Sequence, residues 1–444
     1  MKTYLIRFTT KGIKNLDKLT SVDFYNNSIT KGKTIDLEKK NLKGIFGING
    51  AGKSAYVLAL DIYNSITTKN DYLVQNIIRT KLDKLINKAT KELLMECIFA
   101  VSKEDDETKV DEIFKHTIIV SPKYEYGQTE LKLEEKLEKL IGTTINTDYS
   151  LVYEVNDGKL LVNDNLVDKE WFINEYSNRL EKSSLASYMK NSLDKQDVTG
   201  EDVNKKQLLW FVSWVFINSF TTKVFIDMDD LYDNVKLNDT FITKYTKIVK
   251  NYTVSFNITE DIIAMDKLSD YEKQVEKLKE FIQILKPNLI DIRIDKKIDG
   301  DYYHCNKILV YENYEVDEEY ESSGIKRIIK MYNYLNLAIK GYKVFIDELD
   351  ANISGVFLDK LLEFYAENGK GQLCFTSHNI MSMNILKQYK NSITVFGETG
   401  KVVNVVKNGH YQPVNLFYEG FIEDCPFNIN SFDFYKTFGL EETD

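Results

Sequence analysis

The segment from Gly47 to Ser54 carries the clearest chemistry in the chain. It reads Gly-Ile-Asn-Gly-Ala-Gly-Lys-Ser and matches the pattern GxxxxGK[ST]. Glycines let such a loop turn so that its N–H groups surround phosphate oxygens, and the helix that follows adds positive potential. Lys53 is then expected to reach the β- and γ-phosphates of ATP, and Ser54 to hold Mg²⁺. The rest of the predicted phosphate cradle is Asn49, Gly50, Ala51, Gly52 and Ala55.

Two nearly identical segments compete for the role of the metal-binding strand. Lys223-Val-Phe-Ile-Asp227 and Lys343-Val-Phe-Ile-Asp347 each place an acid at the end of an apolar, strand-like run. Only the second is followed by another carboxylate, Glu348, which can orient and deprotonate an attacking water. We therefore assign Asp347 to Mg²⁺, directly or through water, and Glu348 to the role of general base. Asp227 is interpreted as an ordinary acid at the end of a core element.

A serine pair and a glycine open a predicted helix at Glu321–Arg327, which we call the signature segment. Ser322, Ser323 and Gly324 allow two interpretations. The first is a simple helix N-cap. In the second, hydroxyl groups, backbone N–H groups and the helix dipole grip the γ-phosphate of a nucleotide bound by a second copy of the chain. Ser323 precedes Asp347 by 24 residues, one helix and one turn, and this spacing favours the second interpretation.

A histidine ends another apolar run. His378 follows Gln372–Ser377 and lies 31 residues after Asp347, where it can sense or polarise the γ-phosphate. A lone histidine is more often structural, and His116, His304 and His410 have no comparable context. Gln75 is the nearest candidate for a glutamine at the nucleotide, but we expect it in or after a helix and not at a strand end.

Apolar periodicity predicts an α/β chain. Strands are expected at Leu5–Thr10, Gly44–Gly47, Leu93–Val101, His116–Val120, Leu151–Val155, Leu289–Ile294 and Lys307–Val310. A helix is expected at Ala55–Ile66. Toward the end of the chain a helix, an apolar strand, a helix and another apolar strand alternate, and two more strands and a tail are expected after His378.

The middle of the chain, from about Lys169 to Lys286, is predicted to be helical. Leu208–Phe220 is a run of about 13 apolar residues, short of the roughly 20 needed to span a bilayer. Leu268–Leu285 has heptad-like spacing and predicts a short helical hairpin or bundle arm. These two stretches either pack on each other or form a surface where a partner or a second copy docks.

Composition limits the cellular setting and the partners. The chain has 444 residues, 43% of them hydrophobic, and a formal net charge of -10, so its overall field repels nucleic acid and any such contact needs a local patch. Its four cysteines lie far apart without a CxxC pair, which argues against zinc and against a disulfide framework. The N-terminus predicts a strand and has no signal-peptide core. We therefore expect a cytoplasmic protein without a membrane partner.

Five segments together resemble the compact ABC-type ATPases of prokaryotic defence. They are RFTTKGIKN, GINGAGKS, ESSGIKR, VFIDELDAN and FTSHN. The relatives are the overcoming-lysogenization-defect (OLD) and anticodon-nuclease-associated ATPases, which group with the repair and SMC heads. The resemblance implies a P-loop ATPase head built from two sequence lobes with an inserted helical arm, divided at 1–164, 165–286 and 287–444. It also implies that Asp350 belongs to a loop touching the partner's nucleotide and that His378 is the switch histidine.

The resemblance implies an ATPase that closes as a homodimer or higher oligomer and controls a separately encoded nuclease or toxin effector in anti-phage defence. Only 66 residues follow His378, too few for the Toprim nuclease of OLD proteins. The alternative is a DNA repair or recombination ATPase that clamps nucleic acid directly. A transporter subunit is disfavoured by the 270 residues between Lys53 and Ser323, and a non-hydrolysing scaffold is disfavoured by Glu348.

Overall fold

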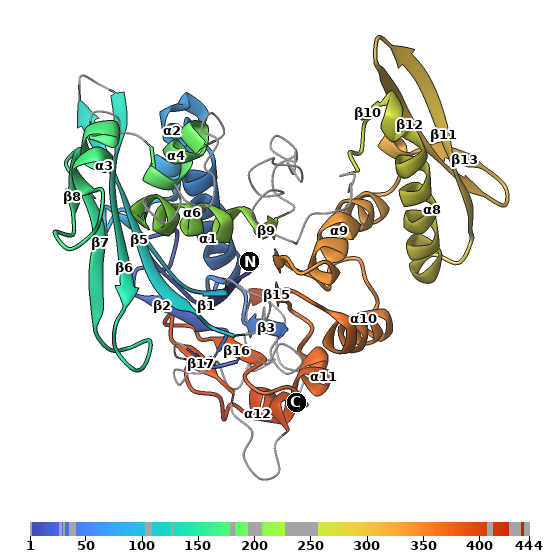
Figure 1. Ribbon diagram of the computed structural model, residues 1–444. Helices are drawn as coiled ribbons and strands as arrows, with labels where there is room; N and C mark the ends of the chain where they lie inside the picture. Colours follow the sequence, from blue (N-terminus) through green and yellow to red (C-terminus); the bar gives the residue numbers. More distant parts are fainter. Residues whose placement is uncertain are drawn as a thin grey trace.

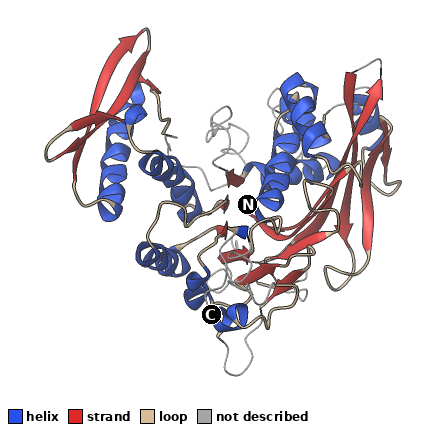
Figure 2. Ribbon diagram, turned by 180° about the vertical axis from the view of Figure 1, so that it is seen from behind, coloured by secondary structure: helices blue, strands red, loops and turns tan. Residues whose placement is uncertain are grey.

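A computed structural model of the chain describes residues 2–25, 29, 32–34, 41–102, 109–125, 128–177, 183–193, 207–226, 256–405, 412–425 and 437–438. Within this part of the chain the fold is mixed α/β and contains three sheets. A large antiparallel sheet and a small sheet with a long helix form two arms, and a mainly parallel sheet lies between and below them (Figures 1 and 2).

The parallel sheet draws its strands from distant parts of the sequence. Its order is β17-β16-β3-β15-β14-β9, and all neighbours are parallel except β16 and β17. The strands β3, β14, β15 and β16 are buried along their whole length, as expected for a parallel sheet covered on both faces. The bounds are β3 Leu42–Gly47, β9 Thr222–Phe225, β14 Lys343–Ile346, β15 Gln372–Thr376, β16 Ile393–Phe396 and β17 Val402–Asn404.

Helix α1 (Lys53–Thr68) follows β3 directly and is buried on nearly every side. Thirteen of its 16 residues are buried, so it is a core helix rather than an amphipathic surface helix. It contacts the parallel sheet, the antiparallel sheet, α4 (Leu185–Leu193) and α6 (Gln207–Phe220). A short turn η1 (Tyr72–Val74) and helix α2 (Asn76–Leu85) follow it. The predicted helix at Ala55–Ile66 is confirmed.

The antiparallel sheet has seven strands in the order β2-β1-β4-β5-β6-β7-β8. It confirms the strands predicted at Leu5–Thr10, Leu93–Val101, His116–Val120 and Leu151–Val155. The bounds are β1 Lys2–Lys11, β2 Thr20–Asp23, β4 Leu93–Ser102, β5 Glu112–Glu125, β6 Gln128–Leu140, β7 Tyr149–Asn156 and β8 Lys159–Val162, followed by α3 Lys169–Tyr176.

The second arm has a hydrophobic core of its own. Helix α8 and the start of α9 pack against the sheet β10-β12-β11, and their apolar side chains form a cluster separate from the main core. The bounds are β10 Asp261–Ala264, η2 Met265–Lys267, α8 Leu268–Leu285, β11 Leu289–Asp299, β12 Tyr302–Tyr311, β13 Glu315–Asp317, η3 Glu318–Tyr320 and α9 Ser323–Ile339. The strands predicted at Leu289–Ile294 and Lys307–Val310 are confirmed.

The last part of the chain alternates as predicted. After β14 come α10 (Gly355–Asn368), β15, η4 (Ile380–Ser382) and α11 (Met383–Leu386). The two strands expected after His378 are β16 and β17, and α12 (Pro413–Tyr418) follows.

The prediction of a helical middle is only partly confirmed. The range 169–286 contains α3, α4, α6 and α8, but also two strands, β9 and β10. Strand β9 pairs with β14, so this part of the middle completes the parallel sheet, whereas β10 and α8 belong to the second arm. The segment Lys223–Asp227 has an apolar, strand-like pattern, but that local pattern does not show which sheet it joins. The boundaries 1–164, 165–286 and 287–444 stay predictions.

The proposed roles of the two apolar stretches are also corrected. Leu208–Phe220 lies in α6, where every residue except Trp210 is buried against α1, α4 and β1, so it is no docking surface. Leu268–Leu285 is the single helix α8, whose heptad side chains face the second core, so it is neither a hairpin nor a bundle arm. The two stretches lie mainly in different cores, although Phe281 and Leu285 of α8 also touch the main core. Within the described part of the chain, no substantial contact joins α6 to α8.

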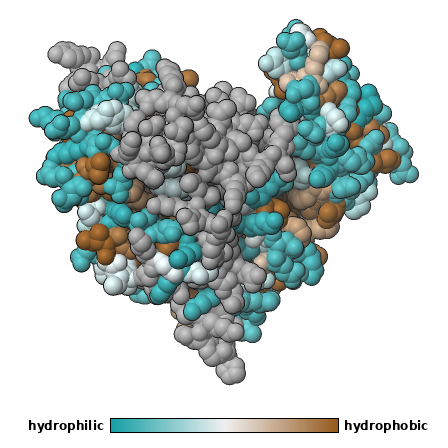
Figure 3. Space-filling model, viewed as in Figure 1, coloured by the Kyte–Doolittle hydropathy of each residue, from teal (hydrophilic) through white to brown (hydrophobic). Residues whose placement is uncertain are grey.

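On the face seen in Figure 3, hydrophobic and hydrophilic residues are interspersed over the described part of the surface. Among the described helices, none is both long and apolar enough to cross a membrane.

Candidate functional site

The segment Gly47–Ser54, predicted to bind phosphate and called the phosphate loop below, is shaped by glycines in the left-handed region of φ. The φ angles are +145° at Gly47, +81° at Gly50 and +97° at Gly52, values that residues with a Cβ rarely adopt. A Cβ at Gly47 would lie 2.4 Å from the carbonyl oxygen of Phe396, and one at Gly52 would lie 2.4 Å from Leu16. The loop therefore needs these glycines for its turn, and it needs Gly47 and Gly52 also for its close approach to Phe396 and Leu16.

Lys53 is buried at the start of α1 and turns back onto the loop. Its Nζ donates to the carbonyl oxygens of Gly47 (2.8 Å) and Ile48 (3.0 Å). Burial lowers the pKa of Lys53, while the charges of Asp347, Glu348 and Asp350 act in the opposite direction. The lysine predicted to reach the phosphates and the three predicted acids thus lie close enough to interact electrostatically.

Strand order explains this proximity. The parallel strands β3, β15 and β14 are adjacent, so their carboxyl ends lie on one edge of the sheet, where ligands of open α/β sheets bind. At this edge Thr376, the last residue of β15, connects the two acids of the neighbouring strand. Its hydroxyl donates to Asp347 Oδ1 (2.6 Å) and accepts from the backbone N–H of Glu348 (2.8 Å).

Ser54 and Asp347 carry the kinds of oxygen ligand that suit the magnesium ion predicted from the sequence. Asp347 is 7% exposed, and Thr376 fixes its carboxylate at the sheet edge. One hydroxyl and one carboxylate are a small protein share, as is usual for Mg²⁺, which takes its other ligands from phosphates and water. No group of three or more His, Cys, Asp or Glu side chains suited to a metal occurs in the described part of the chain. These two residues would hold the ion, which supplies charge neutralisation when bound.

Glu348 is held by its backbone and leaves its carboxylate exposed. Its φ is +53°, an unfavourable angle for a residue other than glycine. The guanidinium of Arg327, on α9, donates to the carbonyl oxygens of Asp347 (2.7 Å) and Glu348 (2.9 Å), and Thr376 holds the N–H of Glu348. The side chain of Glu348 is 48% exposed, so a water molecule can reach it.

The predicted switch histidine lies beside the predicted base. His378 Nε2 is 3.7 Å from Glu348 Oε1, and both side chains are about half exposed. Asp350 Oδ2 accepts the backbone N–H groups of His378 (3.2 Å) and Asn379 (3.0 Å), so this aspartate fixes the loop that carries the histidine. Asp350 Oδ1 is buried without a hydrogen-bond partner in the described residues. Asp350 therefore joins the loop after β14 to the loop after β15.

The signature segment begins helix α9. Ser322 is the N-cap, because its hydroxyl accepts the N–H of Ile325 (3.4 Å), so the simpler interpretation of the serine pair is met by this residue. Ser322 and Ser323 are both exposed. Gly324 faces Asn352, whose side chain would lie 3.3 Å from a Cβ at that position. The helix N-terminus thus presents hydroxyl and N–H groups outward, next to the loop that follows Glu348.

A cavity of about 250 Å³ opens beside Ser54. Ser54, Leu58, Asp61 and Ser65, one face of α1, line one wall. Further lining comes from α2, from β9 and from Tyr334 of α9. Ser54, the predicted metal ligand, therefore lines a space shared by elements from all three thirds of the sequence.

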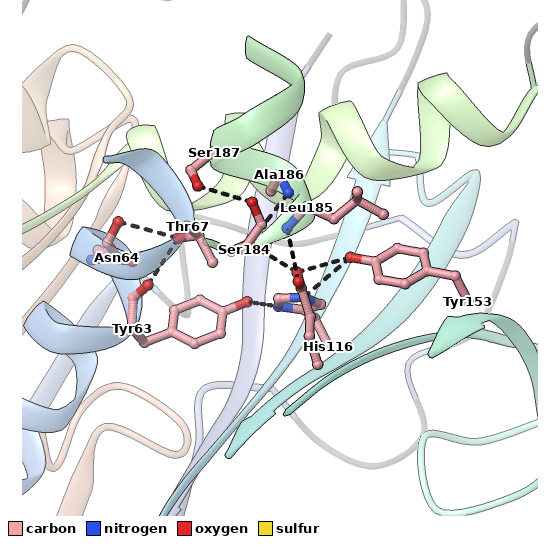
Figure 4. A network of polar contacts seen from close by, with 10 residues as sticks. Tyr63, Asn64, Thr67, His116, Tyr153, Ser184, Leu185, Ala186 and Ser187 are labelled. Carbon is pink, nitrogen blue, oxygen red and sulfur yellow. Dashed lines mark hydrogen bonds and ion pairs between the residues drawn. The ribbon is translucent and has the colours of Figure 1, made fainter. Parts of the chain in front are cut away.

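The far end of α1 is anchored by a buried polar network, shown in Figure 4. Tyr63 OH lies 2.7 Å from His116 Nδ1, and His116 Nε2 lies 2.8 Å from Glu135 Oε1. Glu135 Oε1 also accepts from Tyr153 (2.9 Å), and Oε2 accepts the backbone N–H of Leu185 (2.8 Å). His116 and Glu135 are each 0% exposed at their side chains. This network fixes the phosphate-loop helix to the antiparallel sheet and to α4.

Sequence reasoning missed three residues that organise the site. Thr376 and Arg327 hold the acids, and Asn15 donates from Nδ2 to the carbonyl oxygen of Gly50 in the phosphate loop (2.6 Å). Arg327 lies four residues after Ser323, on the helix opened by the signature segment, and this was the only available signal. Thr376 contacts the acids because β15 lies beside β14 in the sheet. Asn15 contacts Gly50 because two loops 35 residues apart in the sequence meet. No local sequence pattern encodes either contact.

The structure also shows where the weaker candidates for site residues lie. Gln75 precedes α2 as its N-cap and does not end a strand, as expected. Strand β9 confirms the apolar core element before Asp227, but Asp227 itself lies outside the described residues, as does His410. His304 pairs with Glu260 (2.7 Å) in the second arm.

Comparison with known proteins adds little to this picture. The sequence matches no protein-family model and no curated protein. Among solved structures it is similar to the Smc head domain with a coiled coil and joint from Pyrococcus yayanosii, at a TM-score of 0.40 and 11% sequence identity. The likeness covers 91% of this chain and 97% of that one. We base no conclusion on so distant a likeness.

Proposed function

We propose that the chain binds and hydrolyses ATP with Mg²⁺ at the edge formed by β3, β15 and β14. The observation that carries this proposal is the convergence of Lys53, Asp347 and Glu348 at the carboxyl ends of adjacent parallel strands. Lys53 neutralises phosphate charge, and Asp347 with Ser54 holds the metal. Glu348 accepts a proton from the attacking water, and His378 stands beside it to contact the γ-phosphate.

We further propose that two copies close around the nucleotide in the manner of ABC-type ATPase heads. The exposed hydroxyls of Ser322 and Ser323, at the N-terminus of a 17-residue helix, support this arrangement, because such a terminus favours an anion. The two-fold symmetry expected of a homodimer would let each copy supply its serines to the other's phosphate loop. Arg327 then connects the serines offered to one nucleotide with the acids that serve the other.

The motif resemblance supports a finer proposal: closure on ATP holds or releases a separately encoded nuclease or toxin in an anti-phage system. The test is to purify the chain together with the products of its neighbouring genes and to compare ATP with ADP. Nucleotide-dependent capture of one such product supports the proposal, and equal capture in both states contradicts it.

Direct nucleic-acid binding is a second candidate because one local face is basic. Residues 11–18 and 79–92 carry eight lysines and arginines against three acids, although the whole chain has a net charge of -10. Backbone hydrogen bonds from Lys14 to Leu85 and from Asn87 to Gly12 bring the two segments together. If this face contacts a DNA backbone, the affinity for duplex DNA must fall steeply with salt. Absence of such binding at low salt would exclude this candidate.

Replacing Glu348 tests the hydrolytic assignment. The variant Glu348→Gln should bind ATP but turn over at least about 100-fold more slowly, because the amide cannot accept the proton. Lys53→Ala should instead weaken binding. Glu363→Gln, an exposed carboxylate change on α10, is the matched control and should leave phosphate release unchanged. Near-wild-type turnover by Glu348→Gln would remove Glu348 from the role of base.

A further inference from the structure

A cluster of three charged side chains is buried in the second arm, away from the sheet edge of β3, β15 and β14 where ATP is proposed to bind. Lys307 on β12 donates to Asp261 of β10 (2.6 Å) and pairs with Glu318 of η3 (2.8 Å). The exposed fractions of the three side chains are 1%, 1% and 2%. Removing such groups from water is costly unless every charge is matched. The cluster is therefore retained against a considerable desolvation penalty.

The cluster has one cation for two carboxylates, and the carboxylates are unequally partnered. Asp261 accepts from Lys307, from Tyr271 OH (2.8 Å) and from the backbone N–H of Asn257 (2.7 Å). Glu318 pairs with Lys307 through Oε2, while its Oε1 is buried without a partner in the described residues. Asp261 is thus the better site for the single negative charge that balances Lys307.

The directions of the pKa shifts agree that Glu318 does not carry the negative charge that balances Lys307. Burial raises the pKa of Glu318 to about 8, and the nearby Lys307 opposes that shift only in part. Burial alone would lower the pKa of Lys307, but Glu318 and Asp261 raise it above its ordinary value. Near neutral pH the cluster therefore holds Lys307 charged and Glu318 protonated.

The thiol and the phenol that face the cluster keep their protons in this pH range. Burial raises the pKa of Cys305, on β12, to about 11, and raises the pKa of Tyr271, on α8, above its ordinary value. Asp317, at the end of β13, adds a negative charge beside Glu318. Helix α9 contributes apolar side chains, including Ile325 and Ile329. Glu318 is therefore the member whose charge changes just above neutral pH.

The cluster lies directly before the signature segment. Glu318 begins the turn η3, which ends at Tyr320, and Glu321 and Ser322 follow. Glu321 is also fixed, because it accepts from Tyr311 OH (2.5 Å) and from the backbone N–H of Ser322 (2.7 Å). Two anchored carboxylates thus set the path of the chain into Ser322 and Ser323.

We propose that the Lys307–Asp261–Glu318 cluster positions the signature serines, and that a second negative charge in it loosens η3 and weakens the ATP-closed dimer. This inference rests on the proposed function, since the serines are taken to contact the partner's nucleotide. Glu318 acts here as a positioning residue and touches no substrate.

The test compares wild type with Glu318→Gln, which imitates the protonated side chain at every pH. ATP-dependent dimerisation is measured by sedimentation from pH 6.5 to 9.5. The wild type should lose about tenfold in dimer affinity above a midpoint near pH 8, whereas Glu318→Gln should equal it at pH 7 and stay constant. Glu319→Gln, an exposed neighbouring change, should follow the wild type. An equal alkaline loss in Glu318→Gln, or no loss in wild type, overturns the proposal.

Hydrogen exchange without nucleotide separates this inference from the proposed function. Exchange at residues 318–325, corrected for the intrinsic effect of pH, should speed up above about pH 8 in wild type but not in Glu318→Gln. If no dimer forms at any pH, the shared-site proposal fails and this exchange comparison still decides about Glu318. Identical corrected exchange in both proteins contradicts the positioning role.

Discussion

The two arms that flank the nucleotide edge each contain a buried polar cluster, and the clusters differ in how completely they are partnered. In the first arm, both oxygens of Glu135 accept hydrogen bonds, and its pKa is lowered because His116 and other donors outweigh the effect of burial. In the second arm, Glu318 keeps one buried oxygen without a partner in the described residues, and its pKa is raised. Full partnering makes the first cluster a fixed anchor, while incomplete partnering leaves the second open to change with pH.

The difference in hydrogen bonding matches the part of the proposed nucleotide site that each cluster holds in place. The first fixes α1, which carries Lys53 and Ser54, the residues proposed to hold phosphate and Mg²⁺. The second supports the approach to Ser322 and Ser323, which are proposed to act only when a second copy closes. The phosphate loop is thus fixed by a fully hydrogen-bonded network, while the signature segment depends on the charge balance of the cluster before it.

Removal of Glu135 should have the largest effect on stability. Glu135→Ala leaves His116, Ser184 and the N–H of Leu185 buried without this acceptor, so we expect a loss of about 3–5 kcal/mol in the free energy of unfolding. Glu134→Ala, on the same strand but partly exposed and paired with Lys132, should cost less than about 1 kcal/mol. Urea titration measures both. A loss near that of the control would show that the first cluster is no anchor.

A smaller effect concerns the pH dependence of stability, in which Glu318 of the second arm is compared with a buried lysine of the parallel sheet. Lys343 begins β14, is 2% exposed, and donates to the hydroxyls of Thr3 and Thr221 (2.7 Å each), while burial lowers its pKa to about 7. Between pH 7 and its ordinary pKa near 10.5, the unfolded chain binds more protons at this lysine than the folded chain does. Its contribution to stability therefore rises with pH in that window.

Glu318 contributes the opposite slope. Its folded pKa of about 8 lies above the ordinary 4.5, so its contribution falls as pH rises from 4.5 through 8. Relative to Lys343→Met, the wild type should gain about 1–2 kcal/mol in unfolding free energy between pH 7 and 9. Denaturant titrations at both pH values test this difference, with Glu318→Gln as the companion. A wild-type gain below about 0.5 kcal/mol would mean that Lys343 is protonated in the folded state.

The sequence predicted best those features encoded in consecutive residues. The loop Gly47–Ser54 was predicted because its glycines and lysine lie within eight consecutive residues. The positive φ angles of Gly47, Gly50 and Gly52 confirm its turn. Strands β3, β14 and β15 were predicted because continuous burial makes continuous apolar runs. The brief strand β9 was missed as part of the sheet, since its pairing with β14 joins residues about 120 positions apart.

Contacts that depend on the three-dimensional arrangement were not predicted. Arg327 bonds the backbone after β14, and Thr376 bridges Asp347 and Glu348, but neither residue type is diagnostic by itself. His116 had no functional sequence context, and its role emerged only when α1, β5 and β6 came together. The buried cluster of Lys307 was hidden because a lysine on a strand is ordinarily read as exposed.

The central claim, that one nucleotide site is built from two copies, is tested most directly by mixing two inactive variants. Lys53→Ala removes the phosphate-loop lysine, and Ser323→Arg blocks the signature segment, so each protein alone should lack ATPase activity. Their heterodimer keeps one site with an intact loop from one copy and an intact signature from the other. An equal mixture should therefore recover up to about a quarter of wild-type phosphate release. No recovery at any ratio, although cross-linking shows heterodimers, would contradict the shared site.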